Sequence, residues 1–87
     1  MSVNNYKFTD AATAQVYPTH ATDRITVVAD EEELQYLKIY DILGNNVTHM
    51  VQQIERDDST AIIDVSNLKK GVYIVKTYTT AHKIYKE

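Results

Sequence analysis

Apolar and polar residues alternate along most of this chain with a period of two, the period of a β-strand that buries one face. Residues 24–30 show it most clearly, because Ile25, Val27 and Ala29 share one face while polar residues hold most of the other. β-Branched and aromatic residues, which favour strands, dominate these runs. The pattern predicts six further strands: a short one ending at residues 16–17, then residues 34–41, 47–54, 61–65, 71–79 and 82–87.

Polar residues separate the runs. Pro18 lacks a backbone N–H and ends the first strand. The acidic triplet at residues 31–33 predicts a solvated loop, and the sequence ERDDST at residues 55–60 predicts another. Residues 29–43 allow a helical alternative, because an acidic first turn suits the helix dipole. Its apolar positions fit a period of 3.6 only in part, so a strand is favoured from Leu34 onward, with Leu37 and Ile39 facing inward.

The sequence YDILGNNV contains a turn signal. Asp41 stands three residues before Gly44, which suits a type I turn followed by a left-handed residue. Asn45 and Asn46 also tolerate positive φ. We therefore expect a hairpin with a bulge at this point.

A second turn lies between two apolar runs in IDVSNLKKGVYIVK, residues 63–76. We expect Leu68 to face inward beneath the turn, Gly71 to allow the chain to re-enter the sheet, and Tyr73, Val75 and Thr77 to share the inner face of the next strand. The spacing Leu68-x-x-Gly71-x-Tyr73 resembles the tyrosine corner of immunoglobulin-like sandwiches, in which the ring is buried and its hydroxyl bonds an upstream backbone group. The alternative is that Tyr73 is an ordinary strand tyrosine.

Strands at intervals of about 8 to 12 residues with such turns predict an all-β protein, either a sandwich or a barrel. The resemblance to a tyrosine corner favours an immunoglobulin-like β-sandwich of about seven antiparallel strands. A chain of 87 residues forms one domain. We assign residues 14–87 to it and residues 1–13 to an N-terminal extension or linker.

Composition narrows the function further. The net charge of −3 and the lack of a basic run with interleaved aromatics give no indication of nucleic-acid binding. The chain has no cysteine, which excludes disulfides and thiolate zinc sites. Residues 1–10 include no apolar stretch typical of a signal peptide, and no segment approaches the length of a membrane span. If the protein is exported, we expect a leader that was removed or a longer parent chain.

No catalytic or metal-binding constellation is evident, so we expect neither an enzyme nor a cofactor. His20, His49 and His82 are far apart in sequence, without partners at ligand spacing. Residues 57–58 offer two carboxylates, but a solvated loop explains them more simply. Serines lack a neighbouring histidine, and the two glycines stand alone rather than in a phosphate-binding loop.

Three tyrosines are candidates for a contact face. Tyr36 and Tyr40 should share the outward face of one strand, and Tyr78 is expected on the outward face of another. Such an aromatic strip suits a protein or carbohydrate ligand. Packing beneath a loop or against a neighbouring domain is the alternative.

Three blocks of sequence, in order, resemble a known family. They are VYPTHATDRITV, LKIYDILGNNV, and IDVSNLKKGVYIVKT followed by HKIYKE. They are similar to the C-terminal sorting domain of the type IX secretion system of Bacteroidetes, over about residues 14–87. The family's blocks read Tyr-Pro-Asn-Pro-Ala-Thr-Asp, Leu-Tyr-Asp-x-x-Gly-Arg and Leu-x-x-Gly-x-Tyr-x-Val, with a short basic closing strand. This chain departs from them at Thr19–His20, where Asn-Pro is usual, and at Asn45, where Arg is common.

The resemblance implies a non-enzymatic domain that directs an attached cargo through the periplasm to the outer-membrane export machinery and on to the cell surface or the medium. It carries over a set of structural or recognition positions: Pro18, Asp23, Asp41, Gly44, Leu68, Gly71, Tyr73, Val75, Lys83 and Lys86. The partner is then the export machinery, with no nucleic acid and no membrane span. The alternative function is a free-standing secreted or periplasmic immunoglobulin-like binding or adhesion module, with a protein or carbohydrate ligand.

Overall fold

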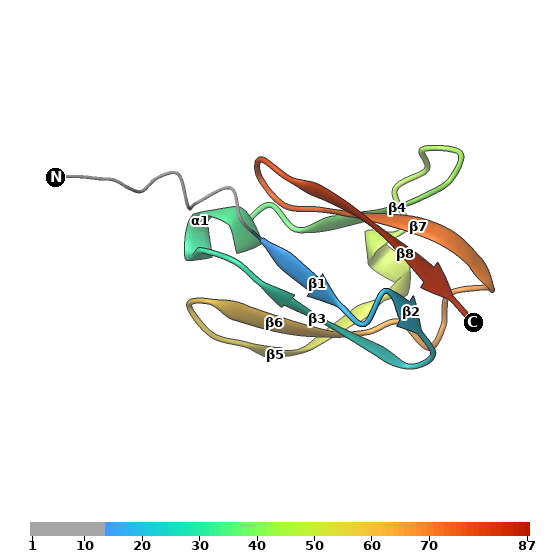
Figure 1. The fold of residues 1–87 in the computed structure, drawn as a ribbon, viewed down its shortest axis with the longest axis horizontal. Helices are drawn as coiled ribbons and strands as arrows, with labels where there is room; N and C mark the ends of the chain where they lie inside the picture. Colours follow the sequence, from blue (N-terminus) through green and yellow to red (C-terminus); the bar gives the residue numbers. More distant parts are fainter. Residues whose placement is uncertain (1–13) are drawn as a thin grey trace, which may run out of the picture.

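The computed structural model describes residues 14–87, so the expected extension or linker, residues 1–13, lies outside the described residues. Eight strands, one short α-helix and one 3₁₀ helix make up the described chain (Figure 1). In order they are β1 (Gln15–Tyr17), β2 (His20–Ala21), β3 (Arg24–Val28), α1 (Glu31–Leu34), β4 (Lys38–Asp41), η2 (Thr48–Met50), β5 (Gln52–Arg56), β6 (Thr60–Asp64), β7 (Gly71–Lys76) and β8 (Ala81–Lys86).

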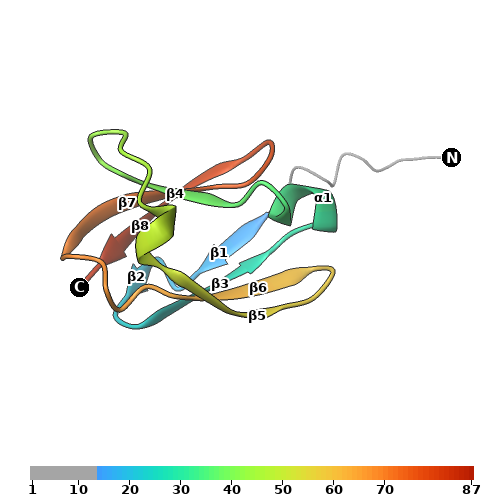
Figure 2. The ribbon, with the colours of Figure 1, turned by 180° about the vertical axis from the view of Figure 1, so that it is seen from behind.

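The strands form two four-stranded sheets, in the orders β1-β3-β6-β5 and β2-β8-β7-β4. The two sheets face each other as layers (Figures 1 and 2). The predicted all-β sandwich is confirmed. It differs in detail, because an eighth strand, β2, runs parallel to β8 while every other described pair is antiparallel. Strand β2 could not be predicted, because two residues are too few to show a period.

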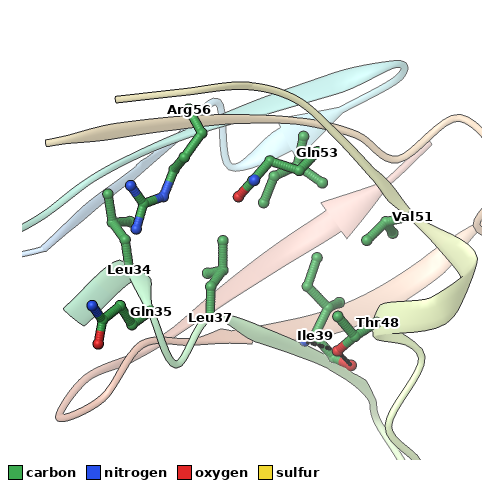
Figure 3. A pocket seen from close by; sticks show the side chains of 9 residues that line it. Leu34, Gln35, Leu37, Ile39, Thr48, Val51, Gln53 and Arg56 are labelled. Atoms are coloured by element: carbon green, nitrogen blue, oxygen red, sulfur yellow. Dashed lines mark hydrogen bonds between the residues drawn. The ribbon is translucent and has the colours of Figure 1, made fainter. Parts of the chain in front are cut away.

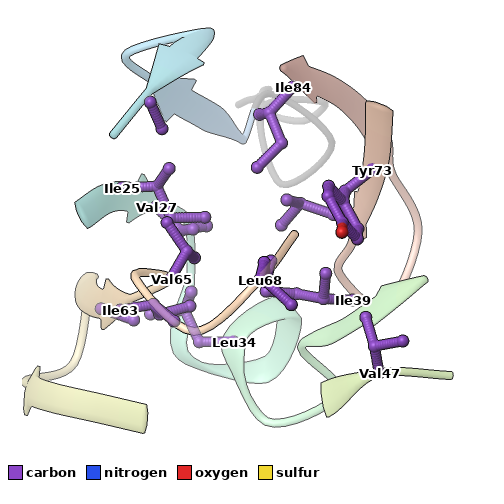
Figure 4. Close-up of a cluster of buried hydrophobic side chains, with 13 residues drawn as sticks. Ile25, Val27, Leu34, Ile39, Val47, Ile63, Val65, Leu68, Tyr73 and Ile84 are labelled. Atoms are coloured by element: carbon purple, nitrogen blue, oxygen red, sulfur yellow. The ribbon is translucent and has the colours of Figure 1, made fainter. Parts of the chain in front are cut away.

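The core lies between the sheets and follows the period of two. In β3, β6 and β7 every second residue is buried, and Ile25, Ile63 and Val75 are at most 2% exposed. Each such side chain contributes about 1.5–3 kcal/mol by burial. Figure 4 shows Ile25 and Ile63 from one sheet facing Ile39 and Ile84 from the other. The whole cluster is Ala21, Ile25, Val27, Leu34, Ile39, Val47, Ala61, Ile63, Val65, Leu68, Tyr73, Val75 and Ile84.

Residues 31–37 differ from the prediction. The acidic triplet forms the helical turn α1 instead of a solvated loop, and the strand expected from Leu34 starts only at Lys38. Glu33 and Leu34 are adjacent, yet each is only 3% exposed. A strand points neighbouring residues to opposite faces, whereas a helical turn lets both face inward. The helical alternative is thus right for a single turn.

Other element boundaries also shifted. The strand expected over residues 47–54 divides into η2 and β5, and a register shift between Gln53 and Glu55 interrupts its alternation. Strand β5 extends to Arg56, so the loop expected at residues 55–60 shrinks to residues 57–59. Strand β7 ends at Lys76, and residues 77–80 form the turn to β8.

The two ends of the sandwich carry different connections (Figure 1). One end holds residues 18–23, 41–47 and 65–71 and the last residues of β8; we call it the motif end. Strand register supports this grouping, because Asp41 pairs with Tyr73 and Gly71 pairs with Lys86. The opposite end holds α1, the β5–β6 and β7–β8 turns, and the start of the described chain. Within residues 14–87 no helix has the length and hydropathy to span a bilayer.

Candidate recognition surface

The connection from β6 to β7 crosses from one sheet to the other and is held by a buried tyrosine. Leu68 is 4% exposed and donates its backbone N–H to the Val65 carbonyl at 3.0 Å. Gly71 has a φ of +154°, which L-residues rarely adopt. The Tyr73 ring is 7% exposed, and its hydroxyl donates to the Lys69 carbonyl at 2.6 Å. This is the geometry that the Leu68-x-x-Gly71-x-Tyr73 spacing predicts for a tyrosine corner.

A second fixed turn follows β4. The Asp41 carboxylate accepts hydrogen bonds from the backbone N–H of Leu43 and of Asn45, each at 2.9 Å, and from the Asn45 side-chain amide at 3.0 Å. These hydrogen bonds hold the pKa of Asp41 below its ordinary value, and the bond from the Asn45 side-chain amide has the largest effect. Gly44 has a φ of +89° and donates to the Asp41 carbonyl. After the turn, Asn46 forms a single antiparallel β-bridge with Tyr40. The expected full hairpin does not form, because the chain then enters η2.

The segment before β3 fastens the last strand. Pro18 follows a cis Tyr17–Pro18 bond and is exposed. The Thr19 carbonyl accepts from the Tyr85 N–H at 2.7 Å, which joins this segment to β8. Asp23 keeps its side chain in solvent and uses its backbone carbonyl to accept from the Val65 N–H at 2.8 Å. Asp23 therefore contributes to the corner through its main chain.

The two lysines carried over to the closing strand have different environments. Lys83 is exposed, with its ammonium 5.6 Å from the centre of the Tyr85 ring. Lys86 faces inward at 9% exposure and donates to the Glu87 carbonyl at 3.0 Å. His20 Nδ1 lies 3.3 Å from the Glu87 carboxylate, at the rim of the sheet.

The ten positions taken from the family resemblance form two overlapping sets, and Lys83 belongs to neither. Asp41, Gly44 and Gly71 shape turns, and Leu68, Tyr73 and Val75 are buried beneath them, so these six determine the fold. Pro18, Asp23, Asp41, Gly44, Leu68, Gly71 and Lys86 lie at the motif end (Figure 1). Lys83 is an exposed side chain in the middle of a sheet.

Glu33 is a buried carboxylate that sequence reasoning missed. Its Oε1 accepts from the Thr77 hydroxyl at 2.7 Å and from the Thr79 N–H at 3.0 Å, and its Oε2 accepts from the Thr79 hydroxyl at 2.8 Å. Burial raises the pKa of Glu33, but these hydrogen bonds outweigh it, so the pKa lies below its ordinary value. The bonds tie α1 to the β7–β8 turn. One acidic residue among three gave no sequence signal that it alone points inward.

The candidate tyrosine face is only partly as expected. Tyr36 lies in the turn after α1 and Tyr78 in the β7–β8 turn, so neither is on a strand as expected. Their rings stack with centroids 4.7 Å apart. Both rings remain about half exposed, at 51% and 56%. The Glu33 carbonyl accepts from the backbone N–H of both residues, which holds the pair together. Tyr40 is half-buried and lies opposite Ile74 on the outer face of the sheet.

A cleft of about 460 Å³ opens between β4 and β5, the edge strands of the two sheets (Figure 3). Its wall is mainly aliphatic, and Gln35, Gln53 and Arg56 are its longest polar side chains. Thr48 also lines it, but its hydroxyl already accepts from the Ile39 N–H at 2.9 Å. No carboxylate, histidine or serine is part of the lining. The cleft therefore offers no acid, base or nucleophile.

Histidine and acidic side chains do not converge elsewhere in the described chain. Residues 14–87 contain no group of three or more metal-ligating side chains close enough to hold an ion. His20 and His49 are exposed, and His82 shares a hydrogen bond with Thr80 at 3.1 Å.

These features define a small β-sandwich module whose characteristic sequence positions mostly fix two turns and a corner at one end. A family model described as the secretion system C-terminal sorting domain matches residues 15–87, and the chain belongs to this family. It is the type IX sorting domain family that the three sequence blocks resemble. Comparisons with curated proteins and with solved structures gave no match. The family is one of sorting signals for export to the cell surface or for secretion, not one of enzymes.

Replacing Tyr73 tests the corner. Tyr73→Phe keeps the ring but leaves the Lys69 carbonyl without its donor, so we expect a loss of about 1 kcal/mol in the free energy of unfolding. Tyr73→Ala removes the ring as well and should cost about 3–5 kcal/mol. Urea denaturation followed by circular dichroism measures both values. A loss below about 0.5 kcal/mol for Tyr73→Phe contradicts the corner.

Glu33 should make stability depend on pH. Because its pKa is lowered on folding, its contribution is present above the unfolded value of about 4.3 and is lost as pH falls through the folded value. Glu33→Gln should destabilise the domain at pH 7 by about 1–2 kcal/mol through weaker hydrogen bonds, and flatten the loss of stability below pH ~4.3. The control is Glu32→Gln, an exposed neighbour on the same turn. The free energy of unfolding is measured by urea denaturation at pH 7 and below pH ~4.3. If the two substitutions change it equally at both pH values, the pH-dependent role of Glu33 is refuted.

Proposed function

We propose that residues 14–87 direct an attached cargo protein to the outer-membrane export machinery, for display at the cell surface or release into the medium after transit through the periplasm. The family match over residues 15–87 is the observation that carries this proposal. The domain acts by being bound and performs no reaction of its own. The cleft between β4 and β5 has no carboxylate, histidine or serine in its lining.

The placement of the chain ends supports the proposal. The described chain starts beside α1, at the end of the sandwich opposite the motif end (Figures 1 and 2). A cargo joined before Ala14 leaves the motif end, with Lys86 and Glu87, on the far side of the domain.

The rigidity of the domain supports it as well. The Asp41 turn and the Tyr73 corner hold their loops with side-chain hydrogen bonds, and β8 is hydrogen-bonded to a strand on each side. A fixed surface loses little conformational entropy when a receptor binds it. We infer that the machinery recognises the folded domain and not an extended peptide.

One observation favours a second function. The Tyr36–Tyr78 pair leaves both rings about half exposed, and exposed aromatic rings bind sugars or proteins. A binding or adhesion module that uses this pair is the alternative. It differs from the sorting domain because it requires no export machinery.

A reporter fusion separates the two functions. Residues 14–87 are placed after a periplasmic signal peptide and a reporter enzyme, in a Bacteroidetes strain that has the type IX machinery and in one that lacks it. We expect the reporter at the cell surface or in the medium of the first strain and in the periplasm of the second. Cell fractionation with reporter activity measures the distribution.

The same reporter without residues 14–87 is the control and should stay in the periplasm of both strains. Retention of the complete fusion in the periplasm of the competent strain rejects the sorting function. Release in both strains also rejects it, because export is then independent of the machinery.

A further inference from the structure

The outer face of the β2-β8-β7-β4 sheet carries lysines and apolar side chains in register. Lys38 on β4 lies directly opposite Lys76 on β7. In the next row Tyr40 lies opposite Ile74, which in turn lies opposite Lys83 on β8. Tyr85 follows two residues along β8 at 38% exposure. We call Lys38, Tyr40, Ile74, Lys76, Lys83 and Tyr85 the cationic face.

The Lys38–Lys76 pair breaks a rule of sheet stability. Like charges directly across two strands repel and destabilise the sheet. The other sheet follows the rule, since Arg24 lies opposite Asp64. Hydrogen bonds from Ser66 and, to a smaller extent, the Arg24 charge lower the pKa of that carboxyl. Side chains that violate local stability rules without a compensating contact are expected at functional sites.

No carboxylate of residues 14–87 forms an ion pair with a lysine of this face. The chain as a whole has 12 acidic and 9 basic residues, so three exposed lysines on one sheet surface run against its overall charge. Among the described residues, none of the three forms an ion pair within 4.0 Å. The nearby Glu87 lies at the rim and faces His20.

The face also presents apolar surface between its charges. Tyr40 and Ile74 are half-buried, and the Lys83 ammonium lies over the Tyr85 ring, 5.6 Å from its centre. Aromatic rings with an exposed polar tip, set among lysines on a rigid sheet, suit a protein surface of opposite charge. A membrane or nucleic-acid partner calls for a larger basic cluster than three lysines.

We propose that the cationic face docks the domain onto a carboxylate-bearing protein surface of the export machinery. This inference rests on the proposed sorting function and names the surface that performs it. Lys38 and Lys76 supply the charge complementarity at one side of the face and Lys83 at the other. Tyr40, Ile74 and Tyr85 supply apolar contact between them.

Charge reversal in the reporter fusion tests the inference. Lys38→Glu with Lys76→Glu replaces one like-charged pair by another, so thermal unfolding of the purified domain should change little. The two new glutamates then repel the carboxylates of the partner surface. We expect the exported fraction of the reporter to fall at least about tenfold relative to the wild-type fusion. Lys38→Arg with Lys76→Arg keeps both charges and should retain export.

The matched control is Lys69→Glu with Lys70→Glu, which makes the same change in net charge on two exposed lysines of the β6–β7 connection. It should leave export unchanged. Equal export of both Glu variants and the wild type overturns the inference while the sorting function stands, and equal loss in both overturns it as a net-charge effect. Failure of the wild-type fusion to leave the periplasm defeats both proposals.

A membrane partner gives a different result. The purified domain is sedimented with vesicles of phosphatidylethanolamine and phosphatidylglycerol. No sedimentation of the wild type is expected. If the wild type binds these vesicles and the Lys38→Glu, Lys76→Glu variant does not, the face binds anionic lipid and the protein partner is wrong.

Discussion

The hydrogen bond from the buried Tyr73 hydroxyl to the Lys69 carbonyl is the contact on which the second sheet depends. It lies where the chain leaves β6 in one sheet and enters β7 in the other. Strand β7 lies between β4 and β8 and, among the described strands, it alone pairs with both. The register of β4 and β8 therefore follows from the position of β7. The ring therefore anchors β7, the strand with which both β4 and β8 pair. Because side chains alternate along a strand, a slip of one residue turns Lys76 inward and Val75 outward. The same contact thus determines which lysines reach solvent.

A second buried contact holds the other end of this sheet. The Glu33 carboxylate accepts hydrogen bonds from Thr77 and Thr79, which flank Tyr78. The backbone carbonyl of Glu33 accepts from the N–H groups of Tyr36 and Tyr78. Three hydrogen bonds to a buried carboxylate compensate its lost hydration, which an unpaired carboxylate at this depth does not achieve. The β4–β7–β8 surface is therefore held at the corner by a phenol and at the β7–β8 turn by a carboxylate. Its exposed side chains extend from a backbone that is fixed at both ends.

The sequence predicted the parts of this structure that depend on neighbouring residues. Alternation identified the inner faces of β3 and β7, and local turn chemistry identified the roles of Asp41, Gly44 and Gly71. The features it missed depend on contacts between distant segments. The inward turn of Glu33 is favoured by threonines 44 and 46 residues later, and β2 exists only because β8 lies beside it. The cationic face is of the same kind, since nothing local relates Lys38 to Lys76 until the register of β4 and β7 is known.

The division between buried and exposed residues bears on how a sorting domain is recognised. Four of the ten positions that carry the family resemblance, Leu68, Tyr73, Val75 and Lys86, are buried, so a receptor cannot contact their side chains while the domain is folded. Asp41, Gly44 and Gly71 shape turns. They set a backbone shape, and shape alone distinguishes poorly between one small β-sandwich and another. Specific recognition then has to come from exposed side chains whose spacing that backbone fixes. In this chain the exposed residues with the least local reason to be together are the lysines of the cationic face. The repulsion between these lysines slightly destabilises the folded domain alone. When a carboxylate-bearing partner lies against them, the attraction between lysine and carboxylate outweighs that repulsion.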